Sequence, residues 1–311
     1  MRVSVVIPAF DAEATVGAAI SSVLWQTYRD FEVVVVDDGA RDSTGAIASS
    51  FPEPVRVVRQ DNAGVAAARN RGIAGAQGEL IAFCDADDVL LPQHLEALVA
   101  AYDRKGGIAT SNCYWLYPGG IDAARTRYKG RFPSPERQRQ AILEQNFVST
   151  MSLFPKSLHE EIGPFDADLQ VAEDWDFWLR AIFAGHRVTL QPKPLALYRR
   201  GGGLSVDERR MDDHSHAVLR KALAQDDLTS EERAYVKRRL AGPGPAQLGR
   251  QGDDALRGRD YREAARRYRE AAALARSEPA LVWKARVMRL PWLAGPLVRA
   301  RQVRIEERIG A

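Results

Sequence analysis

Short apolar, β-branched runs that alternate with segments of helical spacing constrain the fold of this chain most strongly. Four such runs occur near the start of the chain, at 3–7, 32–36, 55–58 and 80–84. Segments with helical spacing lie between them, at 16–27, 43–50 and 64–76. Strands that are apolar throughout and are separated by helices are typical of a parallel sheet with both faces covered. We therefore predict an α/β fold for this part of the chain.

Acidic residues stand at the ends of two of these predicted strands. The second run ends in Asp37 and Asp38, and the fourth is followed by Asp85, Asp87 and Asp88. Ligands of open α/β sheets gather at the carboxyl ends of the strands. Asp85 and Asp87 point to the same side of an extended segment, and a hard divalent cation is typically held by one or two such carboxylates together with phosphate oxygens. The alternative is an acidic turn in which Asp87 or Asp88 caps a helix over 92–104.

Several other classes of protein are excluded by what the sequence lacks. No Gly-x-Gly-x-x-Gly follows the first run and no Walker A sequence occurs, so neither of these nucleotide-binding loops is expected. No apolar run approaches the ~20 residues of a membrane span, and a strand begins at once, so we expect neither a span nor a signal peptide. Cys84 and Cys113 fit no disulfide or metal-ligand spacing. We expect them to be reduced, buried thiols of a cytoplasmic protein. We also expect that the protein has no nucleic-acid partner.

Five segments in a fixed order carry a resemblance to a known family. They are Val-Val-Ile-Pro-Ala-Phe at 5–10, Val-Val-Val-Asp-Asp-Gly at 34–39, Asn-Ala-Gly-Val-Ala-Ala-Ala-Arg-Asn-Arg-Gly at 62–72, Asp-Ala-Asp-Asp at 85–88 and Ala-Glu-Asp-Trp-Asp-Phe-Trp-Leu-Arg at 172–180. Over residues 1–205 the chain resembles the nucleotide-sugar-dependent glycosyltransferases of family 2. Each segment is modest alone, but the order and spacing of all five are highly specific.

The resemblance implies a fold and a division into domains. The expected fold class is α/β, a GT-A type, Rossmann-like, mostly parallel sheet with helices on both faces, plus a C-terminal all-α appendage. Residues 1–210 would form the catalytic domain, with a nucleotide-binding half at 1–105 and an acceptor half at 106–210. Residues 211–311 would form the helical C-terminal region.

The resemblance also implies a set of site residues. Asp87 would be the ligand of a Mg²⁺ or Mn²⁺ ion, and Asp174 would be the general base. Glu173 and Asp174 could equally be the acidic first turn of a helix, and Arg69 could be part of a solvated helix face. The residues implied to hold the nucleotide are Pro8, Ala9, Asp38, Arg69 and Asp85. Those expected to contact the acceptor or the diphosphate are Glu173, Trp175, Arg199 and Arg200.

The expected activity is that of an inverting, metal-dependent, hexosyltransferase-like glycosyltransferase. It would move a sugar from a nucleotide diphosphate, with UDP as the expected nucleotide, to a saccharide or lipid-linked saccharide in cell-surface polysaccharide or glycan synthesis. A single base with direct displacement inverts the anomeric configuration. The alternatives are a nucleotidyltransferase, which would usually have a Gly- and Arg/Lys-rich loop after the first strand, and a non-catalytic sugar-nucleotide-binding protein.

The end of the chain differs in charge and pattern from the rest. Residues 249–311 contain fifteen Lys and Arg against eight Asp and Glu, a net charge of +7, whereas the first 248 residues carry −4. The run Gly-Pro-Gly-Pro at 242–245 predicts a break, and residues 250–276 resemble one tetratricopeptide-type hairpin. Residues 281–305 are basic and contain Trp283 and Trp292. This segment could lie on the inner face of a membrane as a peripheral contact or dock on the preceding helices.

Overall fold

The computed structural model describes residues 1–102, 107–128, 130, 132–200, 208–275 and 279–288. The chain forms two compact units. The first unit consists of residues 1–142 and 146–206, and the second of residues 143–145 and 207–311. Each unit is described by itself.

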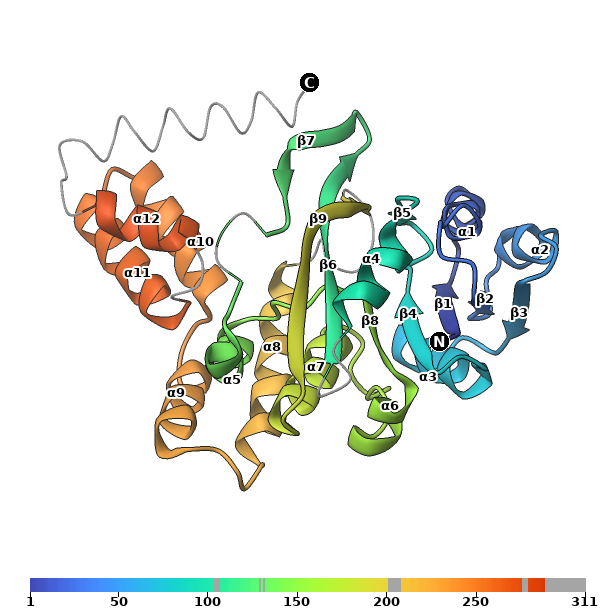
Figure 1. The fold of residues 1–311 in the computed structure, drawn as a ribbon. Helices are drawn as coiled ribbons and strands as arrows, with labels where there is room; N and C mark the ends of the chain where they lie inside the picture. The colour runs from blue at the N-terminus through green and yellow to red at the C-terminus, as the bar shows by residue number, and fades with distance from the viewer. Residues whose placement is uncertain (103–106, 129, 131, 201–207, 276–278, 289–311) are drawn as a thin grey trace. The chain divides into compact units, whose positions relative to one another are not determined.

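One mixed sheet runs through the first unit (Figure 1). Its described strands follow the order β3-β2-β1-β4-β8-β6-β9-β5, and β7 pairs with β6. Their bounds are β1 Val3–Ala9, β2 Phe31–Asp37, β3 Val55–Arg59, β4 Leu80–Phe83, β5 Val89–Leu90, β6 Gly107–Tyr117, β7 Gly120–Thr126, β8 Ser152–Pro155 and β9 Arg187–Arg199. Pairing is parallel among β1 to β4, antiparallel on both sides of β8, parallel between β6 and β9, and antiparallel between β5 and β9.

The direction of the chain across the sheet reverses beside β1. The strands β2 and β3 add to one side of β1, and β4 adds to its other side. Such a reversal leaves a crevice outside the carboxyl ends of the strands, where ligands of open α/β sheets bind. The acidic residues after β2 and β4 therefore lie at the place where the topology favours a ligand.

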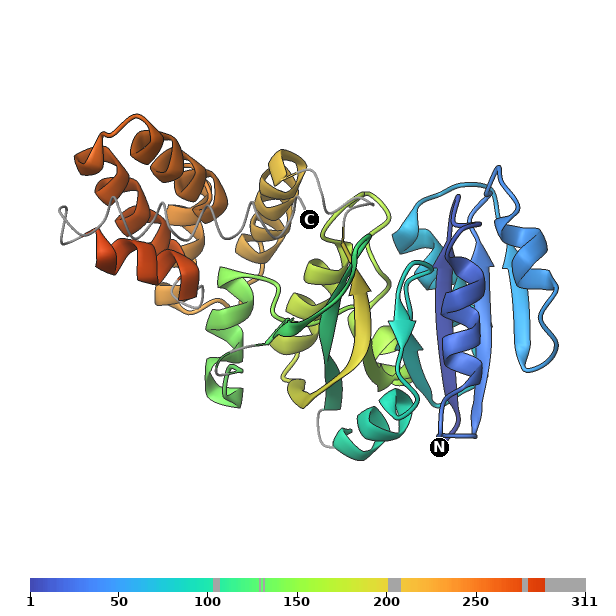
Figure 2. The same ribbon diagram turned by 90° about the horizontal axis from the view of Figure 1, so that it is seen from above.

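Helices cover both faces of the β1–β4 part of the sheet (Figure 2). The helices of this unit are α1 Val16–Leu24, α2 Thr44–Ser49, α3 Val65–Gly75, α4 His94–Ala101, α6 Lys156–Ile162 and α7 Glu173–Phe183, and α5 Gln138–Glu144 ends at the boundary with the second unit. Side chains alternate between the two faces of β1, because successive residues of a strand point to opposite sides. Val5 and Ile7 pack with Ile20 of α1, whereas Val6 faces Gly72 of α3. Both faces of the strand are therefore buried, which explains its continuous apolar sequence.

The helix expected over 92–104 is shorter than predicted. It is α4, which begins at His94 and has Gln93 as its N-cap residue. The short strand β5 lies between it and the acidic residues, so the prediction that Asp87 or Asp88 caps this helix is wrong. The end of the predicted range falls on residues outside the described ones.

An aromatic core joins β4 and β8 to α7. The ring centroid of Phe154 on β8 lies 5.6 Å from those of Phe83 and Trp178 and 5.5 Å from that of Phe177. Phe165 stacks on Phe177 with ring centroids 4.0 Å apart. Aromatic pairs at these distances add to the stabilisation from burial. The core therefore fixes α7, whose first turn carries Glu173 and Asp174, against the centre of the sheet.

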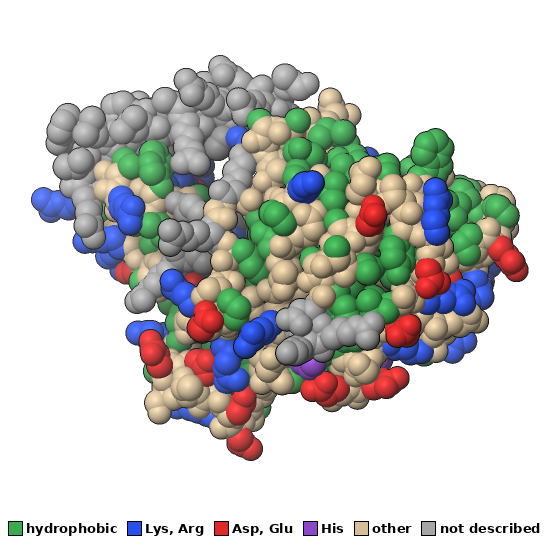
Figure 3. All heavy atoms as spheres, viewed as in Figure 1, with side chains coloured by type: hydrophobic (Ala, Val, Ile, Leu, Met, Phe, Trp, Pro, Cys, Tyr) green, Lys and Arg blue, Asp and Glu red, His purple; other side chains and the backbone are tan. Residues whose placement is uncertain are grey.

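The β6 and β9 part of the sheet has a different covering. The helix α4 packs on these strands on the side facing the viewer in Figure 1. On the same face of the unit, Figure 3 shows hydrophobic side chains over β6 and β9 with few charged side chains among them. Cys84 and Cys113 are both buried and free, which confirms the prediction of buried thiols.

The second unit is helical in its described part. Its helices are α8 Glu208–Leu223, α9 Ser230–Leu240, α10 Pro245–Arg257, α11 Tyr261–Leu274 and α12 Pro279–Val287. The helices α10 and α11 form a hairpin in which Tyr268 is buried and donates a hydrogen bond to Asp253 at 2.5 Å. The proposed membrane-binding segment lies outside the described residues from 289 onward. Within the described ranges, none of the helices combines the length and the hydropathy that a membrane span requires.

Candidate active site

The ends of β1 and β2 form the first wall of the site. Pro8 and Ala9, the last residues of β1, are buried, and the Ala9 carbonyl accepts a hydrogen bond of 2.9 Å from the Asp38 backbone N–H. Oδ1 of Asp38 accepts hydrogen bonds from the Gln60 side chain at 2.7 Å and the Ala63 backbone at 2.9 Å, and its Oδ2 accepts one from the Gly64 backbone at 2.9 Å. Asp38 thus fixes the loop that leads into α3.

The turn after β4 brings together Asp85, Asp87 and Asp88. Oδ1 of Asp85 accepts a hydrogen bond from Nη2 of Arg69 at 3.0 Å. Asp88 is buried, and its Oδ1 accepts the backbone N–H of Arg199 at 2.8 Å, while Oδ2 is buried with no hydrogen-bond partner. The three carboxylates therefore have different surroundings. Asp88 supports the turn by holding β9.

Asp87 is the carboxylate of this turn that remains available for a ligand. It is half-buried, and no described side chain donates a hydrogen bond to its carboxylate. Burial raises the pKa of Asp87, and the negative charge of Asp85 raises it further. A bound cation would offset both effects, because an opposite charge favours the ionised form of a carboxyl group.

The side chains at this turn suit a hard cation whose coordination is completed by its substrate. Among the described residues no group of three or more His, Cys, Asp or Glu side chains could hold a metal ion alone. Mg²⁺ and similar ions are commonly bound by one or two carboxylates plus substrate phosphates and water. The residues present therefore fit an ion that arrives with a diphosphate.

Arg69 connects this turn to α7. Its guanidinium is 3% exposed and pairs with Asp85 at 3.0 Å through Nη2 and with Glu173 at 2.5 Å through Nη1. The interpretation of Arg69 as a solvated residue of a helix face is therefore wrong. Because both terminal nitrogens hold carboxylates, the structure places Arg69 as a bridge between the two acidic motifs.

Asp174 lies beside this bridge, in the first turn of α7. It is half-buried, and its Oδ2 accepts a hydrogen bond from Nδ2 of Asn146 at 2.9 Å, while Oδ1 accepts the backbone N–H of Trp175 at 2.8 Å. Burial raises the pKa of Asp174, and the positive charges of Arg69 and Arg127 oppose this rise. A carboxylate that hydrogen bonds fix in position and whose pKa is raised is well suited to accept a proton. Neither Asn146 nor Arg127 stood out in the sequence, because no local pattern marks them.

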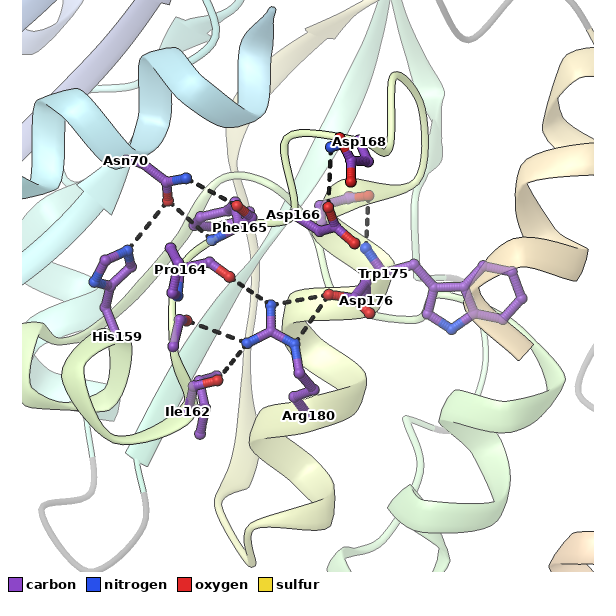
Figure 4. A network of polar contacts seen from close by, with 12 residues as sticks. Asn70, His159, Ile162, Pro164, Phe165, Asp166, Asp168, Trp175, Asp176 and Arg180 are labelled. Carbon is purple, nitrogen blue, oxygen red and sulfur yellow. Dashed lines mark hydrogen bonds and ion pairs between the residues drawn. The ribbon is translucent and has the colours of Figure 1, made fainter. Parts of the chain in front are cut away.

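A polar network fixes the segment that leads into α7 (Figure 4). Asn70, the neighbour of Arg69 on α3, donates a hydrogen bond to the Phe165 carbonyl at 2.8 Å and accepts one from the Phe165 backbone N–H at 2.9 Å. Arg180 donates to the carbonyls of Ile162 and Pro164 and pairs with Asp176. The segment before Glu173 is thus attached both to α3 and to α7 itself.

The four remaining predicted site residues differ in their surroundings. Trp175 is 5% exposed and its indole donates a hydrogen bond to the Ile142 carbonyl at 2.7 Å, so it serves the scaffold rather than contacting a ligand. Nε of Arg199 donates to the Asp87 carbonyl at 2.8 Å, which places Arg199 beside the acidic turn. Arg200 is exposed and its guanidinium lies 5.3 Å from the ring centroid of Trp115. Glu173 is buried, and burial raises its pKa to about 7 against the opposing charge of Arg69.

A comparison with protein families identifies the chain. The family described as "Glycosyl transferase family 2" matches residues 4–163, which is more than half of the 311 residues. The chain belongs to glycosyltransferase family 2. The predicted family and the predicted class of enzyme are thereby confirmed, and the protein is a glycosyltransferase.

Two bacterial proteins are among the curated relatives of this family 2 glycosyltransferase. It is 29% identical over 203 residues to glycosyltransferase YwdF of Bacillus subtilis, an alignment that covers 64% of this chain and 74% of YwdF. It is 31% identical over 230 residues to the succinoglycan biosynthesis protein ExoO of Rhizobium meliloti, covering 70% of this chain and 66% of ExoO.

Solved structures agree with the fold of this glycosyltransferase. The structure of S. aureus TarS 1–349 in complex with UDP-GlcNAc is 18% identical with a TM-score of 0.59, and the alignment covers 100% of this chain and 92% of that one. The structure of the mannosyltransferase PcManGT from Pyrobaculum calidifontis, in complex with GDP-Man and Mn²⁺, is 18% identical with a TM-score of 0.59. The alignment covers 94% of this chain and 85% of that one. These likenesses confirm the predicted fold class.

Proposed function

We propose that this family 2 enzyme is an inverting, metal-dependent glycosyltransferase that takes its sugar from a nucleotide diphosphate donor, UDP in the first instance. The acceptor is a saccharide or lipid-linked saccharide in polysaccharide or glycan synthesis. The observation that carries the proposal is the bridge formed by Arg69. Its guanidinium pairs with Asp85 in the acidic turn after β4 and with Glu173 in the first turn of α7. The similarity to structures with UDP-GlcNAc and with GDP-Man and Mn²⁺ supports a nucleotide-sugar donor, and the similarity to ExoO supports a polysaccharide product.

Asp87 would hold the divalent cation, with donor phosphate oxygens and water as further ligands. Such a cation, when bound, neutralises negative charge that develops on the leaving diphosphate. Asp85 lies in the same turn and is held by Arg69, and we assign to it a contact with the nucleoside. Pro8, Ala9 and Asp38 shape the adjacent wall at the ends of β1 and β2. Arg199, beside Asp87, adds a positive charge on the diphosphate side.

Asp174 would take the proton from the acceptor hydroxyl as its oxygen attacks the anomeric carbon. One bond forms between that oxygen and the sugar, and the bond between the sugar and the diphosphate breaks. Because a single base serves one direct displacement, the product has the inverted configuration. Asn146 holds Oδ2 of Asp174 and the Trp175 backbone N–H holds its Oδ1, so the carboxylate needs little reorganisation.

The proposal is tested by donor turnover and nucleotide binding in the same variants. Purified protein is given UDP-glucose, UDP-GlcNAc or GDP-mannose with Mn²⁺, and release of the nucleotide diphosphate is followed, while calorimetry reports binding of UDP. We expect Asp174→Asn to bind UDP nearly as the parent does and to lose about 10²- to 10⁴-fold in turnover. We expect Asp87→Ala to lose the metal-dependent turnover.

Asp168→Asn is the matched control, because Asp168 is an exposed residue of the segment that precedes α7. It should leave turnover unchanged. Parent-like turnover by Asp174→Asn would assign the base to another residue. Binding of UDP without any turnover by the parent protein would favour the non-catalytic alternative, and transfer of the nucleotide itself would favour the nucleotidyltransferase.

A further inference from the structure

Arg127 is a half-buried cation that the proposed mechanism does not use. It follows the strand β7, and its backbone N–H donates a hydrogen bond to the Cys113 carbonyl at 3.0 Å. Its guanidinium reaches the Val148 carbonyl at 3.5 Å and lies 5.7 Å from the ring centroid of Tyr128. No carboxylate of the described residues forms an ion pair with it. A charge that is partly withdrawn from water and has no directly paired counter-charge is stabilised by a ligand that supplies one.

Residues 146–148 contact both Arg127 and Asp174, the proposed base. Asn146 donates a hydrogen bond to Asp174 at 2.9 Å, and its Oδ1 accepts the Val148 backbone N–H at 3.1 Å. The Val148 carbonyl in turn faces the guanidinium of Arg127. Residues 146–148 therefore connect Arg127 to Asp174, the proposed base, which an acceptor hydroxyl must approach.

The two arginines near the proposed donor site, Arg69 and Arg199, already have partners within the protein. Arg69 is paired with Asp85 and Glu173, and Arg199 is bound to the backbone of Asp87. Burial raises the pKa of Asp87, and Arg199 opposes this rise. Burial also raises the pKa of Asp174, and Arg69 and Arg127 both oppose that rise. Arg127 is thus one of two arginines whose charge acts on the proposed base.

An arginine and two aromatic rings lie near the ends of β6 and β9, and one of the rings, that of Tyr198, is close enough to Arg127 to interact with it electrostatically. The ring centroids of Trp115 and Tyr198 lie 5.6 Å apart with the rings at 90°. The exposed Arg200 guanidinium lies 5.3 Å from the Trp115 centroid, and within the described residues it has no carboxylate partner. Aromatic faces suit the apolar faces of sugar rings, and guanidinium groups bind phosphate and carboxylate in a bidentate manner.

We propose that Arg127 and Arg200, together with Trp115 and Tyr198, form an acceptor subsite for a sugar that carries an anionic group, a phosphate or a carboxylate. This inference rests on the proposed transferase function and adds the chemical class of its acceptor. Arg127 receives the anion next to Asp174, and Trp115 with Arg200 receives the neighbouring part of the acceptor. The subsite thereby selects charged acceptors over neutral ones.

The test measures binding of anionic probes to protein loaded with UDP and Mn²⁺, which fills the donor site. Calorimetric or NMR titrations use glucose 6-phosphate and glucuronate, with glucose as the uncharged match. We expect both anions, or one of them, to bind at least tenfold more tightly than glucose, and the stronger one identifies the anion. Arg127→Gln should lose at least tenfold in that affinity, Arg200→Gln severalfold, and Arg127→Lys less than Arg127→Gln.

Arg125→Gln is the matched control, because Arg125 lies two residues away on β7 and pairs with Asp122. It should bind the probes as the parent does. Urea unfolding of each variant separates lost binding from lost folding, and the exposed Arg200 gives an independent measurement. Equal binding of glucose and both anions, or displacement of the probes by UDP, would overturn this inference while the proposed function stands. Failure of the parent to bind any nucleotide would instead contradict the proposed function.

Discussion

The guanidinium of Arg69 and the carboxylate of Glu173 lie 2.5 Å apart in a buried site, although 104 positions separate them in the sequence. The same guanidinium holds Asp85 at 3.0 Å. The Arg69 guanidinium thus joins α3, the turn after β4 and the first turn of α7. Removing it leaves two carboxylates without their common partner.

We expect Arg69→Met to lower the free energy of unfolding by about 3–5 kcal/mol, because breaking a buried ion pair leaves an uncompensated charge. Adding Glu173→Leu in the same chain should restore part of the loss, since it removes the orphaned carboxylate. Urea unfolding at neutral pH measures both. Arg71→Met, at an exposed position of the same helix, is the control and should change the stability by less than about 0.5 kcal/mol. A stable Arg69→Met protein would contradict the bridge.

The pH dependence of turnover should report the hydrogen bond from Asn146 to Asp174. Burial raises the pKa of Asp174. Because the base works in its ionised form, turnover falls as the pH falls through this pKa. Asn146 donates to the ionised carboxylate, so Asn146→Leu should raise the pKa further and move the acid limb of the profile to higher pH by about one unit. Gln145→Leu is the neighbouring control, and an unmoved limb in Asn146→Leu would assign that limb to another group.

The close approach of α3 to β1 depends on the absence of a side chain at Gly72. A Cβ built there would lie 2.3 Å from Cγ1 of the buried Val6. We expect Gly72→Ala to lower the free energy of unfolding by about 1–3 kcal/mol through overpacking. At Gly75, the last residue of the same helix, a Cβ would meet the Arg56 guanidinium at an ordinary 3.4 Å, so Gly75→Ala should be neutral or slightly stabilising. Equal stabilities of the two variants would contradict this account.

Metal binding should depend on the nucleotide. Since no group of three metal-ligating side chains exists among the described residues, Mn²⁺ alone should raise the melting temperature little. Mn²⁺ with UDP should raise it by more than the sum of the separate effects, because a ligand that binds only the folded state adds to stability. Chelation should reverse the gain. A full shift with Mn²⁺ alone would indicate a site made by the protein itself.

The first half of the fold was predictable because its information is local. The runs that became β1 to β4 are continuous, β-branched and separated by helical spacing, and the strand ends carry Asp38 and Asp85. The helix that begins with Glu173 was equally visible from its acidic first turn. In each of these elements, a short stretch of sequence decides both the structure and the face that is buried.

The contacts that decide the roles of side chains were not predictable, because they join distant positions. Arg69 looks the same in the sequence whether it is solvated or buried against Glu173. Trp175 follows the acidic pair as a ligand contact would, yet its indole is bound to Ile142 in the core. Asn146 reaches Asp174 across 28 positions with no motif of its own. Such roles depend on tertiary neighbours rather than on spacing.

The hydrogen bond from the Arg199 backbone to Asp88 also has a consequence for biosynthesis. It spans 111 positions, and the second hydrogen bond from Arg199 reaches the carbonyl of Asp87. On the ribosome, the acidic turn after β4 emerges long before its partner strand. Residues 1–102 can pair β1 to β4 through near neighbours, but the turn that carries Asp87 gains its support only after β9 has been translated. The acidic turn can therefore reach its final structure only after most of the first unit has been synthesised.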